Sequence, residues 1–136
     1  SPNNRYIASG GFDKKIFIRD FKGNIIRILS GHIWRVYSIS FSPDSRYLAS
    51  SDRKGIIKLW QINTGKLLVN FVGHEKSVKT VSFSPNSRYL VSGGWDNTIR
   101  IWSIKRSIMS MNALAKINKA KPKRKKIRVI RPGFTF

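Results

Sequence analysis

Three residues of this sequence are of the types that many hydrolases use for nucleophilic catalysis: His74, Ser92 and Asp96. A histidine oriented by a carboxylate can take the proton of a serine hydroxyl, which then attacks a carbonyl carbon. The same residue types also form buried structural networks, because a buried imidazole and a buried carboxylate both need hydrogen-bond partners. Nothing beside the three residues indicates an oxyanion hole. The elements that hold them must therefore decide between the two interpretations.

The sequence has few residues suited to a metal site or a phosphate-binding loop. The chain has two His and no Cys, so a metal site is not expected. The pairs Gly10-Gly11 and Gly93-Gly94 occupy equivalent places between a strand and a turn, which favours a structural use over a phosphate-binding loop. We expect no cofactor and no enzymatic activity.

A repeat of about 41 residues organises most of the chain. Ser1, Ser42 and Ser84 each open the same phrase: SPNNRYIASGGFDKKIFIRD, SPDSRYLASSDRKGIIKLW and SPNSRYLVSGGWDNTIRIW. The pairs Gly31-His32 and Gly73-His74 mark the same period. Within each repeat, segments of alternating apolar and polar residues are separated by turn residues, a pattern that predicts β-strands. Self-similarity at this period is typical of the blades of a β-propeller.

The pattern predicts three strands, then four, then three. They cover residues 6–9, 15–20 and 24–29; 36–41, 47–51, 56–62 and 66–71; and 78–83, 89–93 and 98–104. Because propellers close with about 4–8 four-stranded blades, we expect an open arc with exposed sheet faces and edges. A longer polypeptide, another chain or self-assembly could complete it. The beginning at Ser1, within a repeat, favours the first explanation.

These phrases resemble WD40 repeats over about residues 1–104. The resemblance is carried by the Gly-His pair, the Phe-Ser-Pro turn, the turn aspartate and the terminal Trp, which recur in register. It implies an all-β fold, a partial WD40 β-propeller of about two and a half four-stranded antiparallel blades. The expected segments are repeats at 1–30, 31–72 and 73–104, the last with an unclear outer strand. A basic tail at 105–136 follows, with a short helix over 107–120 and then an extended segment.

WD40 blades are held by a buried hydrogen-bonded tetrad of His, Ser or Thr, Asp and Trp. The resemblance carries this tetrad onto His74, Ser92, Asp96 and Trp102 of the third repeat. It therefore favours a structural use of these residues over a catalytic triad.

The other two repeats depart from the tetrad pattern. The middle repeat supplies His32, Ser50 and Trp60. Its aspartate position holds Lys54, and Asp52 lies two residues early. The first repeat has Asp13 in place, but Arg19 stands at the tryptophan position and no Gly-His pair precedes it. We expect incomplete tetrads and looser blades in both repeats.

Surface turns are the first candidate binding site. In the family, the turns between the second and third strands and those leading into the inner strand most often meet partners. On this chain they form a predicted partner-binding face: Phe12, Trp34, Arg35, Arg53, Lys76 and Trp95. Exposed aromatic rings beside cations suit interface hot spots and stacking on bases. The alternative is that Phe12 and Trp95 pack against a neighbouring blade.

The basic tail is the second candidate. The net charge is +21, and residues 105–136 contain 11 of the 27 basic residues and none of the 6 acidic ones. Such a charge favours polyanionic partners. The predicted nucleic-acid contacts are Lys121, Lys123, Arg124, Lys125, Lys126, Arg128 and Arg131. The run that begins at Pro122 also resembles a nuclear-import signal. The alternative is a solvated tail without a specific partner.

Taken together, these features predict a non-catalytic WD40 scaffold or adaptor segment inside a larger assembly. We expect a ribonucleoprotein, such as a ribosome or its precursor, whose RNA backbone binds the tail while the blades dock proteins. Two alternatives stay open: a protein-only adaptor with an acidic partner, and a blade segment of a larger regulatory protein. We expect protein and RNA partners, no membrane partner and no independent monomer. We also expect an intracellular location, with the nucleus, nucleolus or ribosome as candidate sites.

Overall fold

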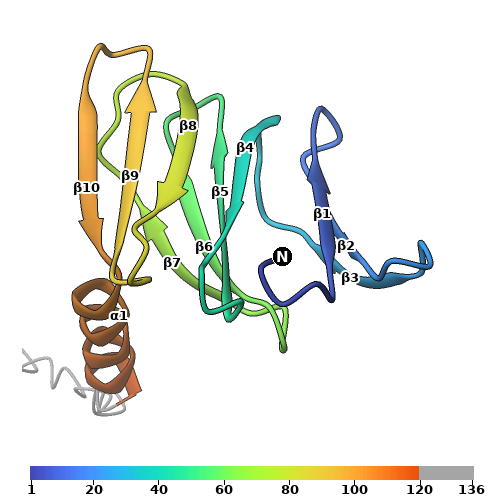
Figure 1. The fold of residues 1–136 in the computed structure, drawn as a ribbon. Helices are drawn as coiled ribbons and strands as arrows, with labels where there is room; N and C mark the ends of the chain where they lie inside the picture. Colours follow the sequence, from blue (N-terminus) through green and yellow to red (C-terminus); the bar gives the residue numbers. More distant parts are fainter. Residues whose placement is uncertain (120–136) are drawn as a thin grey trace, which may run out of the picture.

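The computed structural model describes the backbone of residues 1–119 and the side chains of residues 1–116. Within residues 1–119, ten strands and one helix follow each other (Figure 1). They are β1 (Ile7–Gly10), β2 (Ile16–Arg19), β3 (Ile25–Leu29), β4 (Val36–Phe41), β5 (Tyr47–Asp52), β6 (Ile57–Gln61), β7 (Leu67–Phe71), β8 (Val78–Phe83), β9 (Tyr89–Gly94), β10 (Ile99–Ser103) and α1 (Ile104–Lys119).

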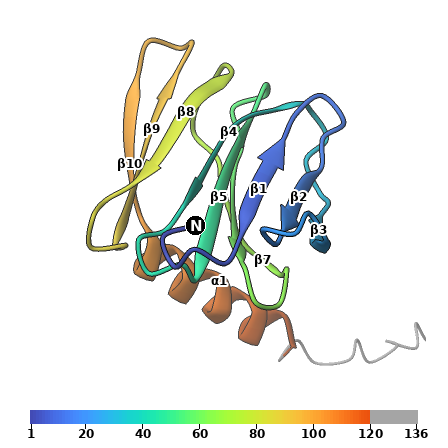
Figure 2. The ribbon, with the colours of Figure 1, turned by 45° about the vertical axis from the view of Figure 1, so that its right-hand side comes forward.

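The strands form three antiparallel sheets that stand side by side in an open arc (Figures 1 and 2). The first sheet has the order β1-β2-β3, the second β4-β5-β6-β7 and the third β10-β9-β8. The predicted mostly-β fold of partial blades is confirmed, with strands of three, four and three. No helix within residues 1–119 combines the length and apolar character needed to cross a membrane.

The helix begins earlier than the sequence pattern predicts. The pattern ends the last strand at residue 104 and begins the helix at 107, but α1 begins at Ile104. Ile104 is buried, and its backbone N–H donates to the carbonyl oxygen of Arg88 at 3.0 Å. Ile108, one turn later, packs against the same core cluster. This i, i+4 apolar pair explains why the helix starts directly after β10 and runs along the strand ends beside β10 and β7 (Figure 2).

Two apolar clusters fill the spaces between neighbouring sheets. One lies between the first and second sheets and includes Ile16, Ile18, Leu48 and Trp60. The other lies between the second and third sheets and includes Leu59, Phe71, Val78, Leu90 and Ile104. The second sheet is therefore buried on both faces, while each outer sheet has one covered face.

The uncovered face of the third sheet is apolar. Val91, Ile99 and Ile101 are exposed there, although the equivalent residues of the second sheet, 42 positions earlier, are fully buried: Ala49, Ile57 and Leu59. The first sheet likewise exposes Ile7 and Ile28 on its uncovered face. Contiguous apolar surface of this kind marks an interaction site.

The tight turn after the second strand of each repeat takes a left-handed residue. These residues are Lys14, Gly55 and Asn97, with φ values of 67°, 87° and 59°. Only Gly55 is also crowded, because a β-carbon there would lie 2.5 Å from the carbonyl oxygen of His74. Glycine is therefore required where the second blade meets the loop that enters the third.

The burial difference between equivalent residues gives a matched test. Ile57→Ala should lower the free energy of unfolding by about 2–5 kcal/mol, because it opens a cavity in a closed core. Ile99→Ala, at 78% exposure, should change it by less than about 0.5 kcal/mol. Urea unfolding followed by tryptophan fluorescence measures both. If Ile57→Ala and Ile99→Ala lowered the free energy of unfolding equally, the outer face of the third sheet would already be covered.

Candidate functional site

The tetrad residues of the third repeat are in contact. His74 Nδ1 lies 2.8 Å from Asp96 Oδ2, and His74 Nε2 lies 2.8 Å from Ser92 Oγ. Trp102 Nε1 donates to Ser92 Oγ at 2.9 Å. An ionised carboxylate only accepts and an indole N–H only donates, so the chain of bonds fixes the protons. In the neutral tautomer that fits these bonds, His74 carries its proton on Nδ1 and the Ser92 hydroxyl donates to Nε2.

This arrangement is suited to structure rather than catalysis. Ser92 is 1% exposed, and its oxygen is occupied by both the His74 ring and the Trp102 indole. Burial alone would raise the pKa of the Asp96 carboxyl, but hydrogen bonds from Thr98, His74 and the backbone N–H of Glu75 and Thr98 lower it well below 3.8. The carboxylate therefore stays ionised and keeps the imidazole in place.

The middle repeat also has a complete tetrad, so the prediction of an incomplete one there is wrong. His32 Nδ1 lies 2.8 Å from Asp52 Oδ2, and His32 Nε2 lies 2.6 Å from Ser50 Oγ. Trp60 Nε1 donates to the same Ser50 oxygen at 2.8 Å. All four residues are buried. The repeat pattern predicts the tetrad aspartate at position 54, which is a lysine in this chain. Asp52, at the end of β5, supplies the carboxylate instead.

The two carboxylates reach the same place from different backbone positions. Asp52 is equivalent to Gly94, while Asp96 is equivalent to Lys54. A β-carbon at Gly94 would lie 2.7 Å from His74 Nδ1 and 2.8 Å from Asp96 Oδ1. A side chain at that position therefore points directly at the histidine. In the second blade, the carboxylate of Asp52 fills this space from the end of β5. In the third blade, Gly94 leaves the space open, and the carboxylate of Asp96 fills it from the turn.

The first repeat lacks this network in the described residues. Arg19, at the tryptophan position, donates to the carbonyl oxygen of Gly23 at 2.9 Å. The exposed Asp13 accepts a hydrogen bond from the backbone N–H of Lys15. The first blade is held instead through its apolar contact with the second.

The residues of the predicted partner-binding face lie at the strand ends near the tetrads. The guanidinium of Arg35 lies 4.8 Å from the centre of the Phe12 ring, and that of Arg53 lies 5.9 Å from the Trp34 ring. A shallow pocket of about 360 Å³ brings Trp34 and Arg53 together with Lys76 and Trp95. Phe12 and Trp95 are 78% and 63% exposed. They are therefore not packed inside a neighbouring blade of this chain.

Three residues of this face were missed by the sequence reasoning. Lys79 Nζ lies between two rings, 3.6 Å from the centre of Tyr37 and 3.9 Å from that of Trp95. Lys54 Nζ lies 5.1 Å from the Trp34 ring. Tyr37 and Lys79 hold equivalent second positions in the inner strands β4 and β8, so the repeat alignment could have identified them. Cations and rings therefore alternate across the face.

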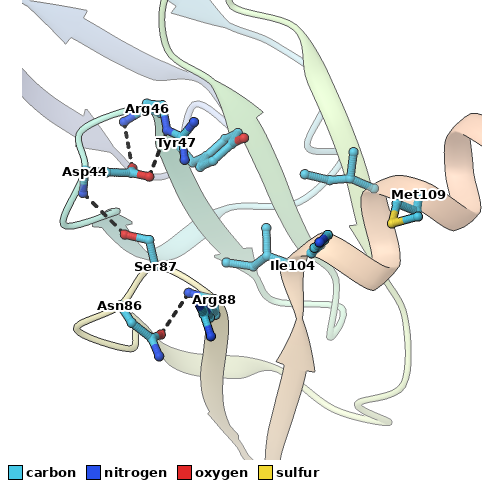
Figure 3. A pocket seen from close by; sticks show the side chains of 10 residues that line it. Asp44, Arg46, Tyr47, Asn86, Ser87, Arg88, Ile104 and Met109 are labelled. Atoms are coloured by element: carbon cyan, nitrogen blue, oxygen red, sulfur yellow. Dashed lines mark hydrogen bonds and ion pairs between the residues drawn. The ribbon is translucent and has the colours of Figure 1, made fainter.

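A second pocket lies at the opposite strand ends, where α1 meets the loops that open the second and third repeats (Figure 3). Arg46 Nε donates to Asp44 Oδ2 at 2.9 Å, and the backbone N–H of Arg88 donates to Asn86 Oδ1 at 3.0 Å. Figure 3 shows Ile104 and Met109 of α1 beside these loops. The loop polar groups are satisfied locally, so this junction serves to seat the helix.

The structure shows no cluster of metal-ligating side chains within its described residues. The predicted nucleic-acid contacts from Lys121 to Arg131 lie outside the described residues, as does the predicted extended segment.

Repeated antiparallel blades with a His–Ser–Trp–carboxylate network define a propeller-type repeat protein. The family model described as "WD domain, G-beta repeat" matches residues 1–20, 23–61 and 65–103. The chain belongs to this WD40 family, whose repeats are generally non-catalytic scaffolds.

Several curated proteins are similar to part of the chain. Nuclear distribution protein PAC1 of Candida tropicalis is 44% identical over 68 residues, which cover 49% of this chain and 14% of that protein. WD repeat and SOCS box-containing protein 1 of Takifugu rubripes is 39% identical over 64 residues, 46% and 15% of the two chains. Human Pre-mRNA-processing factor 17 is 34% identical over 77 residues, 52% and 13%. The matches thus span a small part of each relative.

Exchanging the two carboxylate positions tests the middle tetrad. Asp52→Gly should destabilise the fold by about 1–3 kcal/mol, because it leaves the buried His32 N–H without an acceptor. Adding Lys54→Asp rebuilds the arrangement of the third repeat and should restore most of this loss. Urea unfolding measures both variants.

Asp13→Ala, in an exposed turn, is the control and should cost less than about 0.5 kcal/mol. If the double variant were no more stable than Asp52→Gly alone, the equivalence of the two positions would be refuted.

Proposed function

We propose that this chain is a scaffold segment of a larger assembly, in which the blades dock proteins and the basic tail binds RNA backbone. The observation that supports it is the unclosed arc of blades joined to a strongly cationic chain. Both end sheets present apolar faces, and the net charge of +21 favours a polyanionic neighbour, which would reduce the self-repulsion of the chain. A ribonucleoprotein supplies protein surfaces and phosphates together.

The partner-binding face supports the protein-docking part of the proposal. The rings of Phe12, Trp34 and Trp95 are exposed, and each has a cation against one side. Trp, Tyr and Arg are the residues that most often dominate binding energy at protein interfaces. No ion pair links the cations of this face to a carboxylate within the described residues, so acidic partner residues would complete it.

The tail supports the RNA part. Residues 121–131 hold seven Lys and Arg and no acidic residue. Contacts of this kind bind phosphate without reading base sequence, and their strength falls steeply with salt. The name of one relative, Pre-mRNA-processing factor 17, is consistent with WD40 repeats acting beside RNA. We place this chain inside the cell, with the nucleus, nucleolus or ribosome as the proposed sites.

Charge removal tests the RNA proposal. Changing Lys121, Lys123, Arg124, Lys125, Lys126, Arg128 and Arg131 to Gln should weaken binding to a structured RNA at least about tenfold at 0.1 M salt. The slope of log affinity against log salt should become shallower by about 0.7–0.9 for each phosphate that the tail no longer neutralises. Fluorescence anisotropy at several salt concentrations measures both.

The control variant changes the same kind of charge on the partner-binding face: Arg35, Arg53, Lys54, Lys76 and Lys79 to Gln. It should retain RNA affinity within about threefold, since the tail supplies the main phosphate contacts. If this variant lost RNA binding and the tail variant kept it, the blades would be the RNA site. If the unmodified chain and both variants all failed to bind RNA, the protein-only adaptor would be favoured.

A further inference from the structure

The third sheet lacks the outer strand that the second sheet possesses. In the second sheet, β6 pairs with β7, and Lys58 lies opposite Asn70. The two side chains interact directly, because Lys58 Nζ donates to Asn70 Oδ1 at 2.7 Å. In the third sheet, β10 is the edge strand within the described residues. Its outer backbone N–H and C=O groups are therefore available for pairing.

Arg100 is the β10 residue equivalent to Lys58, and its side chain has a hydrogen-bond donor without an acceptor. Its Nε atom is buried and has no hydrogen-bond partner within the described residues. The guanidinium lies beside Gly73, where a β-carbon would be 3.0 Å from Nη1. A buried cationic donor without an acceptor is costly. In the second sheet, the acceptor for the equivalent cation comes from the outer strand.

A groove lies next to Trp102, whose ring lies beside Gly73 as the Arg100 guanidinium does. It has a volume of about 380 Å³ and is lined by β7, by Trp102 and by one side of α1. The helix contributes Arg106, Ser107, Ser110 and Met111. No carboxylate lines this groove within the described residues, while Arg106 contributes a positive charge to it. The groove therefore favours an acidic occupant with an apolar side for Trp102 and Met111.

We propose that the edge of β10 binds an extended acidic segment that pairs as the fourth strand of the third sheet, and that places an Asp or Asn oxygen against Arg100. This is β-strand addition, in which backbone hydrogen bonds give affinity and alternate side chains give specificity. Residues 120–136 are unsuitable as the occupant, because they contain seven basic and no acidic residues. The occupant is a separate acidic strand, and the proposal does not depend on RNA binding.

The second sheet supplies a probe for this site. A peptide with the sequence of residues 66–72, with two Glu at each end, carries its Asn at the place opposite Arg100. The full chain should bind it in isothermal titration calorimetry, and hydrogen exchange should show protection of the β10 amides. The Asn70→Asp form of the peptide should bind about five- to tenfold tighter, because an ion pair with the Arg100 guanidinium replaces a hydrogen bond to a neutral amide oxygen. N-methylation of alternate peptide amides should abolish binding.

Protein variants separate the groove from non-specific charge attraction. Arg100→Met should remove the preference for the Asp peptide, and Ser110→Trp, which fills the groove from α1, should weaken both peptides at least tenfold. Asn112→Trp, on an exposed part of the same helix and not lining the groove, should leave binding unchanged. Because both peptides are compared on the unmodified chain, the test does not require Arg100→Met to fold.

Three results would overturn the proposal. Equal affinity for the Asn and Asp peptides would remove the role of Arg100. Binding without protection at β10 would place the peptide elsewhere. Protection of β10 that rises with protein concentration in the absence of peptide, together with dimers in sedimentation, would mean that a second copy occupies the groove.

Discussion

The structure depends on one constraint: a twisted four-stranded sheet of this sequence is apolar on both faces and can cover them only against other sheets. The second sheet meets this condition, since its core residues Ile57 and Leu59 on one face and Leu48 and Trp60 on the other are buried by its neighbours. Each outer sheet meets it on one face. The free energy of the fold is therefore concentrated in two interfaces between sheets rather than in any single blade.

The same constraint explains why the hydrogen-bonded tetrads lie where they do. A tryptophan that packs between sheets brings a polar indole N–H into an apolar space, so an acceptor must accompany it. Ser50 and Ser92 provide that acceptor, and the histidine and carboxylate satisfy the serine in turn. Since only the position of the carboxylate oxygen matters, the backbone position that supplies it can differ between blades. Asp52 and Asp96 show both solutions within one chain.

The sequence predicted the strands well, because the repeat supplied three independent copies of each pattern. It failed at Asp52, because the repeat spacing predicts the tetrad carboxylate at position 54. The hydrogen bond to His32 depends only on where the carboxylate oxygen lies, and Asp52 places an oxygen there from another backbone position. It also missed Tyr37 and Lys79, because they lie in inner strands and not in the surface turns to which the family resemblance points. The start of α1 at Ile104 was missed for a related reason: a single apolar residue fits a strand and a helix equally, and only its packing against the core decides.

Most acidic side chains of the described residues are used in local hydrogen bonds, which leaves many basic side chains without a carboxylate partner. Asp52 and Asp96 hold tetrad histidines, and Asp44 is bound by Arg46 and Ser42. With most of the acidic residues committed to local structure, the cations of the partner-binding face and of the β10 groove have few carboxylates within the described chain to pair with. Aromatic rings take part of that role, as where Lys79 lies between Tyr37 and Trp95. Rings hold cations in place without neutralising them, so the blades present ordered positive charge.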